Sequence, residues 1–134
     1  MMKGLLLKAG ERTIEDYGIE VEFSNSLKEY YDVIGCDCIE IIERSIGNRP
    51  FSLVCDEEGL LKSDPIPCCV NAYDREIIYG NVLVTGLTDE EGNLTSLTDE
   101  DVQLILNNTM RVFTTSGKNP GKKFLITLIK TIGD

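Results

Sequence analysis

The stretch CIEIIERSIGNRPFSLVCD, residues 38–56, decides the fold that we expect. Residues 38–44 are rich in isoleucine and predict a β-strand, and residues 51–56 resume the apolar pattern as a second strand. Between them, residues 46–50 contain glycine, asparagine and proline, which interrupt a regular strand. The stretch therefore predicts an antiparallel hairpin, and with it a protein built on a β-sheet.

The segments on either side of this hairpin predict further strands. Residues 5–8 form a short apolar run, and residues 19–23 alternate between apolar and acidic side chains, as a half-buried strand does. Residues 76–85 predict either one bulged strand or two strands joined by a tight turn. Residues 124–132 mix β-branched residues with leucine and predict a strand, with a helix as the alternative.

Two helices are predicted as well. Ser26 and Glu29 match a capping box at the start of a helix over residues 26–35. Thr98 is a favourable N-cap for a second helix over residues 99–113, which begins with three acidic side chains. The chain is thus expected to be a single α+β domain, residues 1–134, on a mixed or mainly antiparallel sheet, with residues 111–134 as a candidate C-terminal extension.

The composition excludes several classes of function. The 134 residues include no histidine, which excludes Ser-His-Asp and Cys-His catalysis and any zinc site with a histidine ligand. The apolar runs are far too short to span a bilayer, and the first residues lack the core of a signal peptide. We therefore expect a cytoplasmic protein without a disulfide framework, and the odd number of cysteines agrees with this.

The net charge of −10 is unevenly distributed along the chain. Residues 51–101 hold 2 basic and 12 acidic side chains, whereas residues 102–134 hold 5 basic and 1 acidic. The acidic middle should repel nucleic acid, so we expect direct nucleic-acid binding only through the basic tail. A GKNPGKK segment in this tail lacks the Gly-Lys-Ser/Thr ending of a phosphate-binding loop and is interpreted as a basic surface loop.

Two nearly identical DEEG segments, residues 56–59 and 89–92, raise the question of a binding site. Each follows an apolar run, so we interpret both as reversing turns in which glycine adopts a positive φ and the acids stay in water. Their consecutive carboxylates lack the alternate spacing of a calcium loop. Mimicry of nucleic acid by a surface of carboxylates is the alternative. The candidate binding residues are Asp56, Glu57, Glu58, Asp89, Glu90 and Glu91.

Two other groups of side chains are weaker candidates. Tyr73 and Arg75 lie near a proline-containing loop and could border a ligand pocket, although an exposed ion pair at a strand edge is the simpler interpretation. Four cysteines could supply thiolates to zinc, but their spacing departs from Cys-x-x-Cys, and we interpret them as small, partly buried apolar residues: Cys36, Cys38, Cys68 and Cys69. We expect neither a metal nor a cofactor.

Three segments together resemble a known family: LVCDEEGLLK at 53–62, IYGNVLV at 78–84 and EGNLTSLTDEDV at 91–102. The resemblance is to a bacterial domain family of unknown function. Its members are small proteins carried by phages, plasmids and conjugative elements, sometimes beside or fused to antirestriction proteins. It covers roughly residues 3–110 and brings no catalytic residues with it. Residues 68–72 contain less asparagine and proline than the family pattern.

The resemblance implies a non-enzymatic accessory protein of a mobile genetic element. Such a protein would act by binding an unidentified host or element-encoded protein, and in the sharpest version it is an antirestriction or other anti-defence protein. The alternative is a small-molecule or nucleotide-binding module. An enzyme is disfavoured because the chain lacks histidine and a recognisable acid-base pair.

Overall fold

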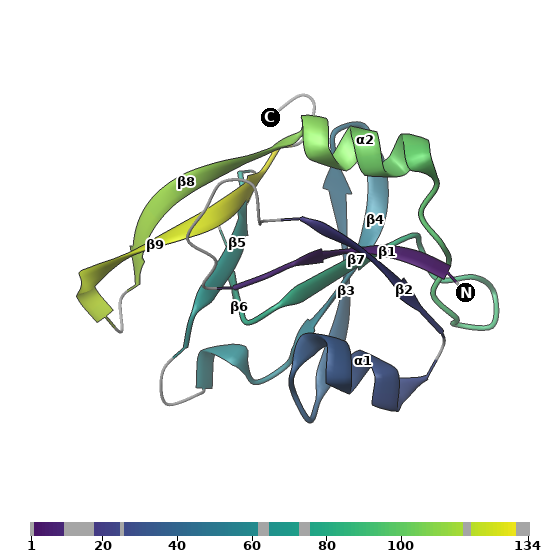
Figure 1. Cartoon of the computed structure of the whole chain (residues 1–134), viewed down its shortest axis with the longest axis horizontal. Coiled ribbons are helices and arrows are strands. Elements are labelled where there is room, and N and C mark those ends of the chain that lie inside the picture. Colours follow the sequence, from purple (N-terminus) through teal and green to yellow (C-terminus); the bar gives the residue numbers. More distant parts are fainter. Residues whose placement is uncertain are drawn as a thin grey trace.

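The computed structural model describes residues 2–9, 18–24, 26–61, 65–72, 76–116 and 119–130. These residues form an α+β fold with two β-sheets and two α-helices, in which nearly all neighbouring strands are antiparallel (Figure 1). The predicted fold class is confirmed. Among the described residues, no helix is both long enough and apolar enough to cross a membrane.

The first sheet has five strands in the order β2-β1-β7-β4-β3, all antiparallel. Its strands are β1 (Met2–Leu7), β2 (Ile19–Phe23), β3 (Ile39–Ile46), β4 (Arg49–Asp56) and β7 (Val82–Thr85). The predicted hairpin is the β3–β4 pair, which stays in register from Ile39 opposite Asp56 to Ile46 opposite Arg49. Two residues close it, and the first, Gly47, has a positive φ of 64°, a conformation that glycine adopts without strain.

The second sheet has four strands in the order β6-β5-β9-β8. They are β5 (Pro67–Asn71), β6 (Ile77–Tyr79), β8 (Thr109–Ser116) and β9 (Asn119–Ile129), and β5 runs parallel to β9. Residues 76–85 thus contain two strands, as one of the two alternatives stated. They do not pair with each other, because the chain turns at Gly80 (φ 84°) and passes from one sheet to the other.

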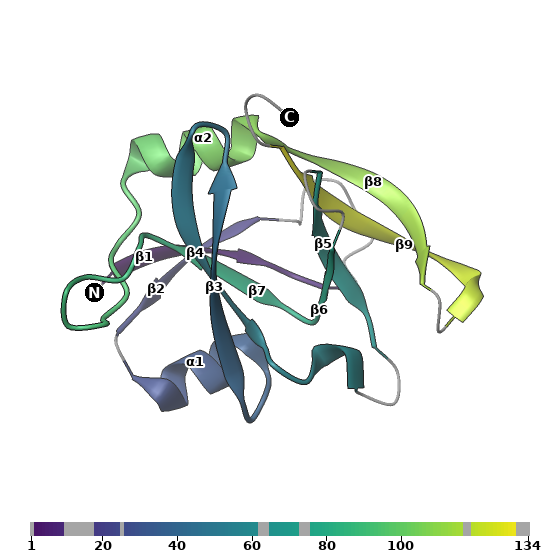
Figure 2. The ribbon, with the colours of Figure 1, turned by 180° about the vertical axis from the view of Figure 1, so that it is seen from behind.

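The core has two layers, one on each face of the five-stranded sheet. One face packs against the second sheet and α2 (Asp99–Asn107), around residues such as Leu5, Leu53 and Ile105. The other face packs against α1 (Leu27–Ile34), through Tyr30 and Ile34 at helical spacing. Figure 2 shows the same arrangement from behind, with α2 and α1 on opposite sides of the sheet. The alternating side chains of β1, β3, β4 and β7 supply both layers.

The first helix begins after Ser26, as expected, but without the expected capping box. The Ser26 side chain makes no capping hydrogen bond. The carboxylate of Glu29 instead accepts hydrogen bonds from the backbone N–H and the hydroxyl of Ser24, two residues before the cap. Gly35 ends the helix in the left-handed conformation, with φ at 80°. The capping-box prediction was wrong because a second serine lies within reach of the same carboxylate.

The second helix is shorter than its prediction of residues 99–113. Its start is confirmed: Thr98 and Asp101 form a reciprocal capping box. It ends at Asn107, and β8 begins at Thr109. The apolar spacing continues past this point, but the residues that carry it are largely β-branched or aromatic and favour a strand. The last apolar run is also a strand, β9, in place of the helix alternative.

Candidate functional site

The two DEEG segments share one local structure at their aspartates. An Asp56 carboxylate oxygen accepts a hydrogen bond from the backbone N–H of Glu58 at 2.9 Å. An Asp89 carboxylate oxygen accepts one from Glu91 N–H at 2.9 Å and a second from Asn93 N–H at 3.0 Å. Each aspartate thus folds its own turn, as aspartate commonly does. Both segments are turns, as interpreted from the sequence.

The two glycines of these segments serve different purposes. Gly92 has a φ of 82°, and a Cβ added there would meet no atom within 4 Å, so its conformation alone favours glycine. Gly59 begins a short 3₁₀ helix, η2 (Gly59–Leu61), and has no positive φ. A Cβ at Gly59 would lie closer than 3.0 Å to the backbone carbonyl of Tyr79 in β6. The positive φ predicted at Gly59 was wrong, since close packing against β6 is what requires glycine there.

The first DEEG segment also does not join two strands of one sheet. It follows β4 in the five-stranded sheet and leads through η2 to β5 in the other sheet. The reversal of direction within one sheet that we expected at this turn was wrong, because the turn carries the chain from one sheet to the other. The second segment lies in the connection from β7 to α2, which closes on itself through an antiparallel bridge between Gly86 and Thr95.

The six candidate acidic residues do not come together. Residues 56–58 lie beside η2, and residues 89–91 lie in the long loop near the N-terminus, far apart in both views (Figures 1 and 2). In a third acidic run, residues 99–101, two of the three carboxylates form ion pairs with basic side chains. Asp99 pairs with Lys3, and Asp101 pairs with Arg49 at 2.6 Å. Within the described part of the chain, the two DEEG turns are therefore separate groups of carboxylates.

The cysteines lie in contrasting environments. Cys38 is exposed, whereas Cys55, Cys68 and Cys69 are buried. Burial raises the pKa of the Cys55 thiol to about 12, and the Cys68 side chain and burial together raise the pKa of Cys69. Within the described part of the chain, no group of three or more His, Cys, Asp or Glu side chains could hold a metal ion. The other weak candidates, Tyr73 and Arg75, fall outside the described residues.

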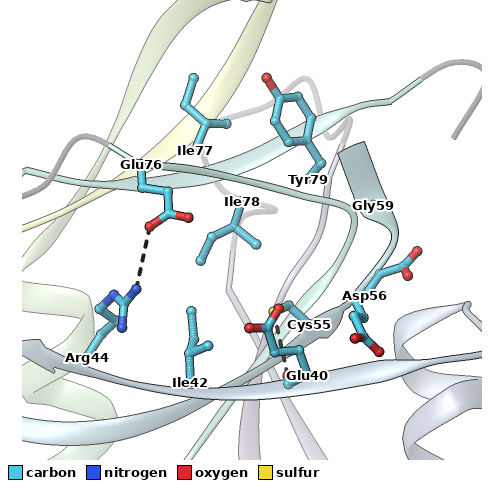
Figure 3. A pocket seen from close by; sticks show the side chains of 11 residues that line it. Glu40, Ile42, Arg44, Cys55, Asp56, Gly59, Glu76, Ile77, Ile78 and Tyr79 are labelled. Carbon is cyan, nitrogen blue, oxygen red and sulfur yellow. Dashed lines mark hydrogen bonds and ion pairs between the residues drawn. The ribbon is translucent and has the colours of Figure 1, made fainter. Parts of the chain in front are cut away.

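A groove between the two sheets is the site that sequence reasoning missed. It encloses about 190 Å³ and is bounded on one side by β3 and on the other by β6 (Figure 3). Figure 3 shows Ile42 of β3 and Ile78 of β6 pointing toward each other across it. The groove is lined by Glu40, Ile42, Arg44, Cys55, Asp56, Glu57, Gly59, Glu76, Ile77, Ile78 and Tyr79. It therefore includes the first DEEG turn but not the second.

The groove is acidic over an apolar floor. Four carboxylates line it, from Glu40, Asp56, Glu57 and Glu76, and Arg44 is the only basic side chain among the described lining residues. An Arg44 guanidinium nitrogen lies 3.6 Å from a Glu76 carboxylate oxygen across the groove (Figure 3). The Glu76 side chain is 71% exposed, so this ion pair is weak and easily exchanged for another. The groove thus presents excess negative charge beside half-buried apolar side chains.

Both strands that border the groove are sheet edges. β3 is the last strand of the five-stranded sheet, and β6 is the last strand of the other. In a two-residue hairpin the closing pair exchanges backbone hydrogen bonds, so the polar backbone groups of Glu40, Ile42 and Arg44 face β4. Those of Ile41 and Glu43 then face away from the sheet. In agreement, the Glu43 carbonyl accepts a hydrogen bond from the Arg44 side chain, at 2.8 Å.

One of three comparisons with known proteins gave a match. The family model described as "Domain of unknown function (DUF3846)" matches residues 2–110. The match ends at the start of β8, so the β8–β9 hairpin that completes the second sheet lies almost wholly beyond it. The comparison with curated proteins and the comparison with solved structures each gave no match. Because the match covers most of the chain, the protein belongs to the family of domains of unknown function DUF3846.

Proposed function

We propose that this chain is a non-enzymatic protein-binding module and that its binding surface is the groove between β3 and β6. One observation carries the proposal: two sheet edges border a groove that is both acidic and apolar. Exposed sheet edges present backbone donors and acceptors to a partner, and proteins commonly use them for recognition. Excess carboxylates add selectivity for a basic partner surface.

The same groove supports a protein partner better than a nucleotide. Its enclosed volume of about 190 Å³ is below the roughly 300–1,000 Å³ of typical small-molecule pockets. Its carboxylates would repel the phosphates of a nucleotide. An exposed groove with a polar margin and an apolar centre is instead typical of protein–protein contacts.

We further propose that the partner is a host or element-encoded protein and that the chain serves a mobile genetic element, in the sharpest version as an antirestriction protein. The resemblance of the DEEG, GNVLV and SLTDED segments to mobile-element proteins supports this, as does the net charge of −10. Because the two DEEG turns lie apart, an antirestriction protein of this kind would bind its partner through the groove alone. A transformation assay tests the anti-defence role: expression of the chain should raise the yield of unmodified plasmid in a restricting host.

Binding through the groove is tested by capture from host lysate with charge-reversal variants. We expect a partner that wild-type protein retains and that Glu40→Lys with Glu57→Lys loses, since both exposed carboxylates line the groove. The matched control is Glu90→Lys with Glu91→Lys, which reverses the same charge on the distant turn and should retain the partner. Equal capture by all three proteins would contradict the proposal. Loss only in the control would move the binding surface to the second DEEG turn.

A further inference from the structure

β3 and β8 are the two long edge strands among the described residues, each eight residues long, and β3 is the one that borders the groove. β2 has five residues and β6 has three, and the register of β3 with β4 runs without a shift. By contrast, the registers of β6 and β8 with their neighbours each shift once. Protein edges are commonly blocked by proline, by a bulge or by a covering loop. β3 has neither a proline nor a bulge along its length.

The groove side of this edge has a defined side-chain pattern. Glu40, Ile42 and Arg44 alternate along β3 and point into the groove. Glu40 lies at the end where the first DEEG turn adds Asp56 and Glu57, and Arg44 lies at the end where Glu76 faces it. Ile42 lies between them, opposite Ile78 (Figure 3). The pattern along the groove is therefore acidic, apolar, then mixed in charge.

We propose that the groove takes an extended segment of a partner protein, which pairs with β3 as a sixth strand and carries basic side chains on either side of a central apolar one. Its backbone would pair with the outward-facing groups of Ile41 and Glu43. The Glu43 carbonyl already accepts a hydrogen bond from the Arg44 side chain, so the segment would use the second lone pair of that oxygen. Alternate residues of a strand lie roughly 7 Å apart on one face, so a basic-x-apolar-x-basic segment spans from Glu40 past Ile42 to Glu76.

The charges of the groove argue for this occupant. Among the described lining residues, four carboxylates against one guanidinium favour lysine or arginine in the incoming segment. A basic side chain near Glu76 can share or replace its exposed ion pair with Arg44 at little cost. This inference rests on the proposed function of the groove and adds the chemistry and backbone geometry of what it binds.

The test uses the full chain and a labelled peptide, Thr-Lys-Thr-Val-Thr-Lys-Thr, with fluorescence polarisation as the readout. The peptide reads the same in both directions, so its orientation need not be known. Two N-methylated versions of the peptide are compared. In the first, the backbone nitrogens of both lysines and of the valine carry methyl groups. In the second, the methyl groups are on the backbone nitrogens of the third, fifth and seventh residues, which are all threonine. In a strand, amide N–H groups point alternately to the two sides. Strand addition therefore predicts that one version binds about tenfold or more weakly, while the other binds like the parent.

Charge reversal provides a second, independent readout. Replacing both peptide lysines with glutamate should abolish binding to the wild-type chain, and the Glu40→Lys, Glu57→Lys variant should instead prefer the glutamate peptide. The Glu90→Lys, Glu91→Lys variant should bind the lysine peptide as wild type does. Increasing salt should weaken the lysine peptide's binding, since exposed charges are screened.

The outcomes separate this inference from the proposed function. Equal effects of the two N-methyl patterns, or no peptide binding at all, would overturn strand addition, and groove-dependent capture from lysate would still support the proposed function. Concentration-dependent self-association that Glu43→Pro abolishes, with no peptide binding, would make a second copy of this chain the occupant and would also overturn the inference. Loss of both peptide binding and groove-dependent capture would reject this inference and the proposed function together.

Discussion

The contrast between Gly59 and Gly92 gives the sharpest test of the fold around the groove. In Gly59→Ala the new Cβ would lie closer than 3.0 Å to the Tyr79 carbonyl, so backbone must move. Forced overpacking of this kind costs about 1–3 kcal/mol of unfolding free energy. For a chain of 134 residues, we expect the melting temperature to fall by roughly 4 °C for each kcal/mol lost.

Gly92→Ala should also destabilise the protein, but for a different reason. Its φ of 82° lies in the left-handed region, which costs a residue with a Cβ about 1–2 kcal/mol, although the space around it is open. Asparagine tolerates this conformation better than alanine. Gly92→Asn should therefore recover much of the loss, whereas Gly59→Asn should be at least as unstable as Gly59→Ala.

Urea denaturation of these four variants and of Gly121→Ala measures the difference. Gly121 has open space around it and no positive φ, so its alanine variant is the matched control and should match wild type within about 0.5 kcal/mol. A Gly59→Ala protein as stable as wild type would refute the close approach of the first DEEG turn to β6. An asparagine rescue at Gly59 equal to that at Gly92 would show that the two turns have the same backbone after all.

Three further perturbations follow from individual contacts. Thr98→Ala removes the side chain of the capping box and should lower the unfolding free energy by about 1 kcal/mol, measured by denaturation. The Lys3 ammonium holds the pKa of Asp99 below its ordinary value of 3.8. The stability that this exposed pair contributes should therefore be present above pH 4 and be lost as the pH falls further. In Lys3→Ala, the unfolding free energy should depend less on pH in this range. Iodoacetamide should modify the exposed Cys38 in the native protein. It should modify the buried Cys55, whose pKa is raised to about 12, only after unfolding, and mass spectrometry of the peptides measures both reactions.

Much of the fold could be predicted because its strongest signals are local. The isoleucine-rich run, the Gly47 turn and the apolar run after it lie within one short stretch, so the β3–β4 hairpin could be recognised without its neighbours. Thr98 and Asp101 likewise mark the start of α2 within four residues. The end of α2 was missed because a helical apolar spacing continues into residues with strand propensity, and pairing with β9 decides between them.

The site was harder to predict because its parts come from different layers. The two DEEG segments have the same four letters, and their aspartates do fold similar turns. Only the tertiary structure distinguishes the glycines, since Tyr79 of β6 approaches Gly59 and nothing approaches Gly92. The groove needs β3 and β6 to be edges of two packed sheets, and strand order is not encoded in any short segment. Arg44 belongs to no recognisable motif, so the sequence alone did not mark it as a groove residue.

The most direct measurement is a map of amide chemical shifts on the isotopically labelled chain, taken with and without the captured partner. We expect the largest changes on residues 40–44 of β3, residues 56–59 of the first DEEG turn and residues 77–79 of β6. Residues 89–92 should not move. Changes centred on those residues, or on the β8 edge at the far side of the second sheet, would contradict the groove as the binding surface.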